Sequence, residues 1–275
     1  MAWLGLYDPL QVWWEDENLD LFLTDKSRKT LITIAVHVWC IPLCKKLLSR
    51  LPESQRTRGC GSAAYAAAQQ GDAELVKFLV QEGNANVNLV VEGYHTAVSE
   101  ACRIGALDIV RYLVEEAQAS VDVRTESDDH ISALAFACIG PSTGMLGLVK
   151  YLVEEANAVV DPPLIAGLCK SPLEIASSPG LLDIVKYLVE QGNADVNLQF
   201  WDIQYGSALA SAVLAKRFDV DKYLVAEAHA DVNLQLHFGL YCTALVTALS
   251  VGSRDIVQFL VEEGMPIYTC TLPAG

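Results

Sequence analysis

The sequence predicts an all-α solenoid, a stack of about seven helix–turn–helix units, and two observations lead to this prediction. A heptapeptide with one apolar pattern occurs six times, at intervals of 34 to 39 residues. An alanine also stands 12 residues before the leucine at the sixth position of most copies. Self-similarity at such a period indicates one supersecondary unit repeated along the chain. The six copies are ELVKFLV (74–80), DIVRYLV (108–114), GLVKYLV (147–153), DIVKYLV (183–189), DVDKYLV (219–225) and DIVQFLV (255–261).

The heptapeptide itself fits a helix with one buried side. Its apolar positions fall at i, i+1, i+4 and i+5, which form a single stripe at helical period. In the fourth copy these positions hold Ile184, Val185, Leu188 and Val189.

A shorter helix is predicted before each heptapeptide, and the alanine closes it. In SPLEIA (171–176), Ser171 suits the N-cap and Pro172 suits the first helical position, where it loses no hydrogen bond. A small residue at the end lets two antiparallel helices approach closely. In one copy Ala137 precedes Leu152 by 15 residues, which places an insertion around 140–144. The other alanines are Ala35, Ala67, Ala101, Ala176, Ala212 and Ala248.

These units resemble the ankyrin repeat. The first-helix pattern of that family, Thr-Pro-Leu-His-x-Ala, is matched in part by SPLEIA (171–176), SALASA (207–212) and TALVTA (243–248). The segment LVEQGNADVN (188–197) is similar to the second helix of the family and the turn after it. The resemblance implies β-turn fingers that project from the stack, and a non-catalytic role in protein–protein recognition. The histidine of the pattern is absent from every copy, and the proline from most.

The resemblance divides the chain into an N-terminal cap segment at 1–29, a repeat domain at 30–264 with a degenerate first copy at 30–49, and a C-terminal tail at 265–275. The apolar side chains of the first segment are predicted to cover the exposed end of the stack, because a solenoid needs capped ends. A membrane-facing or partner-facing patch is the alternative. The side chains concerned are Trp3, Leu4, Leu6, Tyr7, Trp13 and Trp14.

A finer resemblance lies in LYDPLQVWW (6–14), which is similar to the junction into the C-terminal ankyrin arrays of fungal NACHT-type signalling ATPases. It implies that the chain is the sensor portion of such a protein or a stand-alone relative. No phosphate-binding GxxxxGK(S/T) loop occurs in the sequence.

Charge is distributed unevenly along the chain. The net charge is −15, yet 26–58 contains eight basic residues and one acidic residue, Glu53. From Gly59 onward, 11 basic residues stand against 27 acidic ones. An acidic body repels phosphate backbones, so we expect no nucleic-acid partner. The basic segment offers a dock for an acidic partner or anionic lipid, or it is a solvated face.

Membrane, metal and cofactor roles are not expected. The uncharged run at 31–44 is shorter than the roughly 20 residues that a membrane span needs. No basic region begins the chain, which argues against a secretory signal. The eight cysteines show no recurring pair spacing, so they are interpreted as reduced core residues. We expect a cytoplasmic monomer without metal or cofactor.

Recognition residues are predicted in the fingers, where the copies differ. Loops on a rigid scaffold concentrate binding residues, and exposed aromatics dominate many interfaces. Aromatic side chains that staple neighbouring fingers together are the alternative. The predicted partner-binding residues are Tyr94, His95, His130, Trp201, Tyr205, His237, Phe238 and Tyr241.

Two other functions stay open. An enzyme or small-ligand receptor would use the concave groove, with Asp128, Asp129 and His130 as acid–base groups and Glu100 nearby. No nucleophile turn, glycine-rich cofactor loop or complete ligand set accompanies these residues, which favours a non-catalytic role. Homotypic self-association is the second alternative.

Overall fold

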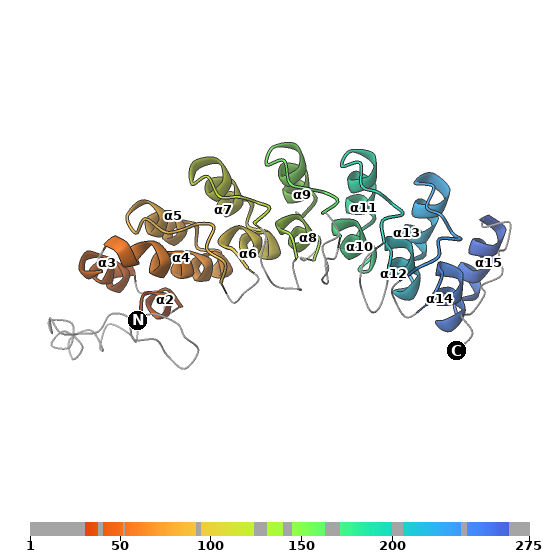
Figure 1. The fold of residues 1–275 in the computed structure, drawn as a ribbon, viewed down its shortest axis with the longest axis horizontal. Coiled ribbons are helices and arrows are strands. Elements are labelled where there is room, and N and C mark those ends of the chain that lie inside the picture. Colours follow the sequence, from red (N-terminus) through yellow and green to blue (C-terminus); the bar gives the residue numbers. More distant parts are fainter. Residues whose placement is uncertain are drawn as a thin grey trace.

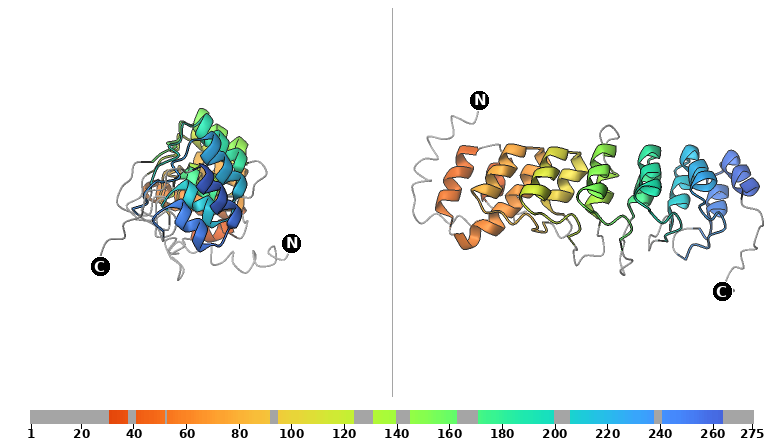
Figure 2. Two further views of the ribbon diagram at one scale, coloured as in Figure 1. Left: turned by 90° about the vertical axis from the view of Figure 1, so that its right-hand side faces the viewer. Right: turned by 90° about the horizontal axis from the view of Figure 1, so that it is seen from above.

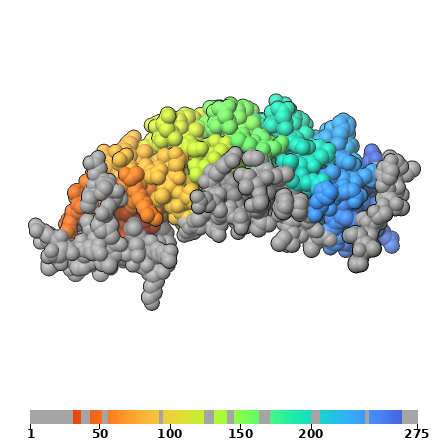
Figure 3. All heavy atoms as spheres, viewed as in Figure 1, coloured from red at the N-terminus to blue at the C-terminus, as the bar shows by residue number. Residues whose placement is uncertain are grey.

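The protein is a curved stack of paired helices (Figure 1). A computed structural model describes residues 31–37, 41–51, 53–91, 95–123, 131–139, 145–162, 171–199, 206–237 and 241–263. The pairs follow one another in chain order along an arch, with α2 and α3 at one end and α14 and α15 at the other (Figures 1 and 2). In the space-filling view the described helices form one continuous arched body (Figure 3).

Two rows of helices build the arch. The inner row follows the concave side and the outer row the convex side (Figure 1). The inner helices are α2 (Leu31–His37), α4 (Glu53–Gln70), α6 (Ala97–Ile104), α8 (Ala133–Ala137), α10 (Pro172–Ser177), α12 (Ala208–Leu214) and α14 (Ala244–Ser250). The outer helices are α3 (Ile41–Arg50), α5 (Ala73–Gln81), α7 (Leu107–Arg111) continued by the π-helical turn η2 (Tyr112–Glu116), α9 (Met145–Glu154), α11 (Leu182–Glu190), α13 (Phe218–Lys222) continued by η3 (Tyr223–Glu227), and α15 (Arg254–Glu263).

The core confirms the register predicted from the spacing. The predicted alanine of each inner helix, from Ala35 to Ala248, is completely buried. The matching outer-row leucines, from Leu47 to Leu260, are at most 2% exposed. Each helix pair therefore contributes the same two residues to one continuous core, as expected for a solenoid whose units bury their apolar faces against their neighbours.

Hydroxyl side chains cap the inner helices from α6 to α14. Ser171 accepts a hydrogen bond from the Glu174 amide at 3.1 Å, and Pro172 occupies the first helical position, as predicted. Thr96 and Ser99 form a reciprocal capping box. Such caps satisfy amides at the helix start that have no partner within the helix. Ser132, Ser207 and Thr243 cap their helices in the same way.

The described turns between an inner and an outer helix each contain a left-handed residue. Gly105 and Gly180 supply it, with φ angles of 78° and 84°. In the sixth pair the same position is Lys216, at φ 58°. A side chain in this region is strained, so this turn is less favourable than the others.

The outer row is held together by a repeated clamp around an aromatic ring. Lys150 lies 5.6 Å from the ring centroid of Tyr187, whose hydroxyl donates to Glu154 at 2.9 Å. One pair further on, Lys186 lies 5.1 Å from the Tyr223 ring centroid. A lysine within the heptapeptide and the glutamate that directly follows this heptapeptide thus contact the tyrosine of the next pair.

A second ladder links the turns that follow the outer helices. Asn88 accepts a hydrogen bond from the Ser120 amide at 2.8 Å, and Asn197 accepts one from the Asp231 amide at 2.8 Å. Asp122 and Asp161 do the same for the turns between them. The recurring Val-Asn and Val-Asp pairs therefore have a structural role: each polar side chain fixes the base of the next finger.

The described cysteines pack as predicted. Cys44, Cys60, Cys102 and Cys138 are fully buried, and Cys242 is half-buried. Burial raises the pKa of the Cys60 and Cys138 thiols to about 12, so both are protonated at neutral pH. None of the helices that the structure describes is long and apolar enough to cross a membrane.

Candidate partner-binding surface

A groove lies on the concave side, where three inner helices stand side by side. It has a volume of about 630 Å³, and residues in or beside α8, α10 and α12 line it. Ile131 and Ile139 come from the two ends of α8, and Ile175 from α10. Ile139 is 49% exposed, an unusual position for a large apolar side chain. The groove therefore offers apolar surface to a ligand.

The groove also carries two buried polar side chains. Glu174 of α10 is 2% exposed and Ser211 of α12 is fully buried. The Ser211 hydroxyl has no hydrogen-bond partner within the described part of the chain. Thr247, which occupies the same position of the next inner helix, instead donates to the Thr243 carbonyl at 3.0 Å. A buried hydroxyl without a partner is costly, and a ligand in the groove could satisfy it.

A cation closes one end of the groove. Arg217 follows α12, and its Nε donates to the Ser178 carbonyl of the preceding pair at 3.1 Å. Its side chain lies so close to Gly180 that an added Cβ there would come within 2.9 Å of the arginine Cδ. This glycine lets the arginine span two repeats. The groove thus presents a carboxyl group, a hydroxyl group and a guanidinium among isoleucines.

Of the four residues considered for acid–base chemistry in an enzyme, only Glu100 lies among the described residues. Glu100 lies in α6 and is 2% exposed, and both of its carboxylate oxygens accept hydrogen bonds from Arg103. The shortest of these bonds is 2.6 Å. The lone pairs of this carboxylate are therefore already engaged by the guanidinium, in a charge-assisted bidentate pair. Asp128, Asp129 and His130 lie outside the described residues.

A model of ankyrin repeats matches residues 32–125 and 134–236, well over half of the chain. The chain belongs to the ankyrin repeat family. The prediction of an ankyrin solenoid is therefore confirmed, and so is the general class of function, since ankyrin domains are typically protein–protein interaction scaffolds. The match does not fix the number of repeats, so the count of about seven stays a prediction.

The crystal structure of the human ASB11 ankyrin repeat domain has a similar fold. Its TM-score with this ankyrin chain is 0.60, and the two are 24% identical over 74% of this chain and 84% of that one. At this identity the similarity concerns the fold alone. No curated protein matches the sequence.

The structure places three of the eight predicted partner-binding residues of this ankyrin stack. His95 lies at the base of a finger, where its backbone forms a bridge with Val91. Its ring lies 6.4 Å from that of Tyr65 and 5.1 Å from that of Phe136, measured between centroids. This stacking fits the alternative of an aromatic staple. The bridge with Val91 places His95 where the finger returns to the inner row, and its contact with a partner stays a prediction.

His237 and Tyr241 flank the last ankyrin finger. His237 is exposed, and its amide donates to the Gln199 side chain at 3.1 Å; Tyr241 is half-buried. The backbone hydrogen bond from Leu236 to Cys242 joins the two sides of this finger. Both residues are therefore held by a paired finger base. Tyr94, His130, Trp201, Tyr205 and Phe238 lie outside the described residues.

The groove residues were missed by sequence reasoning, although one signal was present. Glu174 occupies the position that holds histidine in the ankyrin first-helix pattern, and it is completely enclosed rather than solvated. Ile139 could not be found from periodicity, since it lies after the end of its helix. Among the described residues, no group of three or more histidine, cysteine, aspartate or glutamate side chains is arranged to hold a metal ion.

Proposed function

We propose that this ankyrin stack recognises a partner protein through the concave groove between α8, α10 and α12, with the fingers forming the rim. The observation that carries the proposal is the combination of exposed isoleucine with the buried Glu174 and Ser211 in one cavity. Binding sites in proteins combine apolar walls with a few polar groups that fix orientation in this way.

The chemistry of the groove suggests what the partner presents. An apolar side chain fits between Ile139 and Ile175, and a neighbouring lysine or arginine fits beside the Glu174 carboxyl. The acidic body of the chain, at net −15, favours approach of a basic segment through long-range attraction. We therefore propose a partner segment that is both apolar and basic.

The fingers contribute the rest of the surface in this proposal. The aromatic and histidine side chains predicted from the sequence would surround the groove, and the ladder of turn hydrogen bonds holds the finger bases in place. A surface that is already ordered loses little conformational entropy when it binds. The proposed rim residues are Tyr94, His95, His130, Trp201, Tyr205, His237, Phe238 and Tyr241.

A matched pair of variants tests the groove. Ile139 and Leu249 are both large, exposed apolar residues, at 49% and 59%, but Leu249 lies in α14, away from the groove. The intact chain should capture its partner protein from an extract of the source cells. We expect the Ile139→Ser variant not to capture that protein. Leu249→Ser should retain that protein. Equal retention by both variants would place recognition elsewhere.

A small-molecule ligand is the second candidate, because a volume of about 630 Å³ also suits a drug-sized molecule. In that case Ser211→Ala would weaken binding of the molecule, and thermal-shift screening of metabolites would identify it. Catalysis at Asp128, Asp129 and His130 would add turnover to such binding.

The finer predictions remain part of the proposal. The similarity of residues 6–14 to fungal NACHT-type arrays suggests that the groove is the sensor surface of a signalling protein; these residues lie outside the described part. We further propose a monomer in the cytoplasm that binds no nucleic acid. Sedimentation velocity tests the first point, since self-association would raise the sedimentation coefficient with concentration.

A further inference from the structure

The first outer-row interface lacks a carboxylate that several later interfaces have. In two later pairs a glutamate four residues after the cation accepts a hydrogen bond from the next tyrosine: Glu154 from Tyr187 and Glu190 from Tyr223. In α3 the cation is Lys45, and the residue four positions on is Ser49. The ring of the next pair is Phe78, which has no hydroxyl group. The lysine and the ring are kept, but the carboxylate is not.

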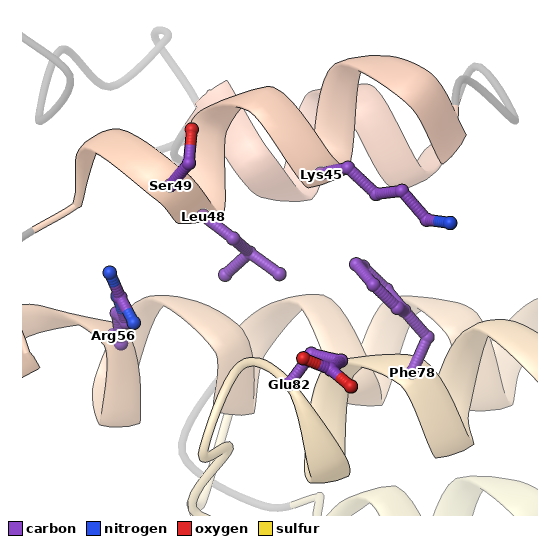
Figure 4. Close-up of a pocket in the computed structure, with 6 residues that line it drawn as sticks. All are labelled: Lys45, Leu48, Ser49, Arg56, Phe78 and Glu82. Atoms are coloured by element: carbon purple, nitrogen blue, oxygen red, sulfur yellow. The ribbon is translucent and has the colours of Figure 1, made fainter.

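A cavity of about 400 Å³ lies at this interface, between α3, α4 and α5. Figure 4 shows Lys45 directed toward Phe78 on one side, Arg56 on the other, and Leu48 between them. Lys45 Nζ lies 5.5 Å from the centroid of the Phe78 ring. The cavity thus has apolar side chains between two cations, and the Glu82 carboxylate also lines it.

The arginine is oriented by its own hydrogen bond. Arg56 Nε donates to the Leu51 carbonyl at 2.8 Å, and the residue is half-buried. This contact holds the planar guanidinium at the cavity, where a carboxylate could accept from its other nitrogens. A second charge is therefore fixed in place before any ligand arrives.

No ion pair joins either of these cations to a carboxylate whose side chain the structure describes, although several other cations form such pairs. Lys77, Arg103 and Arg111 form ion pairs with glutamates. The cavity lining includes one acidic residue, Glu82, and it forms no ion pair with Lys45 or Arg56. Lys46 and Arg50 in α3 and Arg58 in α4 add further positive charge to the two helices that carry Lys45 and Arg56. The local charge is therefore opposite to that of the body.

We propose that this cavity binds a carboxylate side chain from an acidic segment of a partner protein. The ligand carboxylate would take the place that Glu154 and Glu190 occupy at the later interfaces, beside the lysine and above the ring. Its methylene groups would contact Leu48 and Phe78. This site lies between α3, α4 and α5 and is separate from the concave groove. Failure of one proposal would therefore leave the other unaffected.

The test uses a fluorescently labelled hexaglutamate peptide, with hexaglutamine as the uncharged probe. Binding is measured by anisotropy near 0.15 M salt, where charges further than about 8 Å away are largely screened. We expect hexaglutamate to bind the intact chain and hexaglutamine not to bind. Ser49→Glu restores the missing carboxylate, so we expect it to weaken hexaglutamate binding by about tenfold, the size of one charge-assisted hydrogen bond.

Gln81→Glu is the matched control. It makes the same substitution of charge at the next interface, where Lys77 lies 5.8 Å from the Tyr112 ring centroid. This variant should bind hexaglutamate as the intact chain does, which separates the cavity from a general change in net charge. Lys45→Gln should weaken binding with an unchanged circular dichroism spectrum.

Three results would overturn the proposal. The first is equal binding of the two peptides, and the second is an equal loss of binding in Ser49→Glu and Gln81→Glu. The third is binding to phosphatidylserine vesicles, abolished by Ser49→Glu, with no binding of hexaglutamate. That last result would assign the cavity to a lipid phosphate or carboxylate instead of an acidic protein segment.

Discussion

Asp221 gives a sharp test of the packing, because it occupies a core position that holds valine in other pairs. The equivalent residues include Val110, Val149 and Val185, all fully buried. Asp221 is also fully buried, and neither of its carboxylate oxygens has a hydrogen-bond partner in the part of the chain that the structure describes. Replacing it with valine, Asp221→Val, should therefore stabilise the protein.

The size of the expected stability difference follows from the pKa of this carboxyl group. Burial, followed by the nearby Asp219, raises the pKa of Asp221 from 3.8 to about 8. The pKa of this carboxyl group is higher in the folded state than in the unfolded chain. The group therefore destabilises the folded state at any pH where it is ionised in the unfolded chain but still protonated in the folded one. At 1.36 kcal/mol per pKa unit, the cost is absent below about pH 4 and reaches about 6 kcal/mol by pH 8.

The assay is urea unfolding of the intact chain and Asp221→Val at pH 5, 6, 7 and 8. Other titrating groups cancel in the difference between the two proteins. We expect the advantage of the variant to grow by about 1.4 kcal/mol per pH unit over this range. Because repeats can unfold in part, amide exchange in α13 should show the same trend. Asp221→Asn separates loss of charge from gain of apolar contact.

A constant difference between the two proteins from pH 5 to pH 8 would refute this reasoning. It would mean that the carboxyl ionises in the folded state at its ordinary pKa. A variant less stable than the intact chain at pH 8 would be a stronger contradiction, since it would show that the carboxylate makes a favourable contact.

Three further predictions concern the joints between repeats. Lys216→Gly should raise the free energy of unfolding by up to about 1 kcal/mol, because glycine adopts φ 58° without strain; thermal unfolding would measure it, and a loss of stability would contradict it. Tyr187→Phe removes the bond to Glu154 and should cost about 0.5–1 kcal/mol in the same assay; no change would show that the ring contact alone suffices. Asn197→Ala frees the Asp231 amide, so its hydrogen exchange should accelerate while amides in α6 keep their rates; unchanged exchange at Asp231 would exclude the ladder as a stabilising contact.

The repeating features of the fold were predictable because each unit packs two antiparallel helices together in the same way. The alanine and leucine spacing follows from the approach of two antiparallel helices, and the structure buries both. The serine and proline at Ser171 and Pro172 predicted a helix start, since those residues satisfy or avoid the free amides there.

The contacts between units were harder to predict. The clamp from Lys150 and Glu154 to Tyr187 joins residues 33 to 37 positions apart, so it has no signal within one helix. The groove at Ile139 depends on a residue just beyond a helix end. The length of α4, 18 residues, exceeds the short inner helix expected from the other copies.

Departures from the repeat pattern are visible in the sequence, but their consequences depend on the packing between helices. Ser49 and Asp221 interrupt columns that otherwise hold a glutamate and a valine in several copies. Only the structure shows that the first interruption leaves two cations beside a cavity and that the second buries a carboxyl group.

The central claim, that the concave groove contacts the partner, is tested most directly by crosslinking. A photoreactive amino acid would replace Ile139 in the groove or, as the control, Val261 on α15, which is 37% exposed. We predict that illumination in an extract of the source cells joins one protein to position 139 and not to position 261. Crosslinking to that protein only at position 261, or equally at both, would contradict the groove as the recognition site.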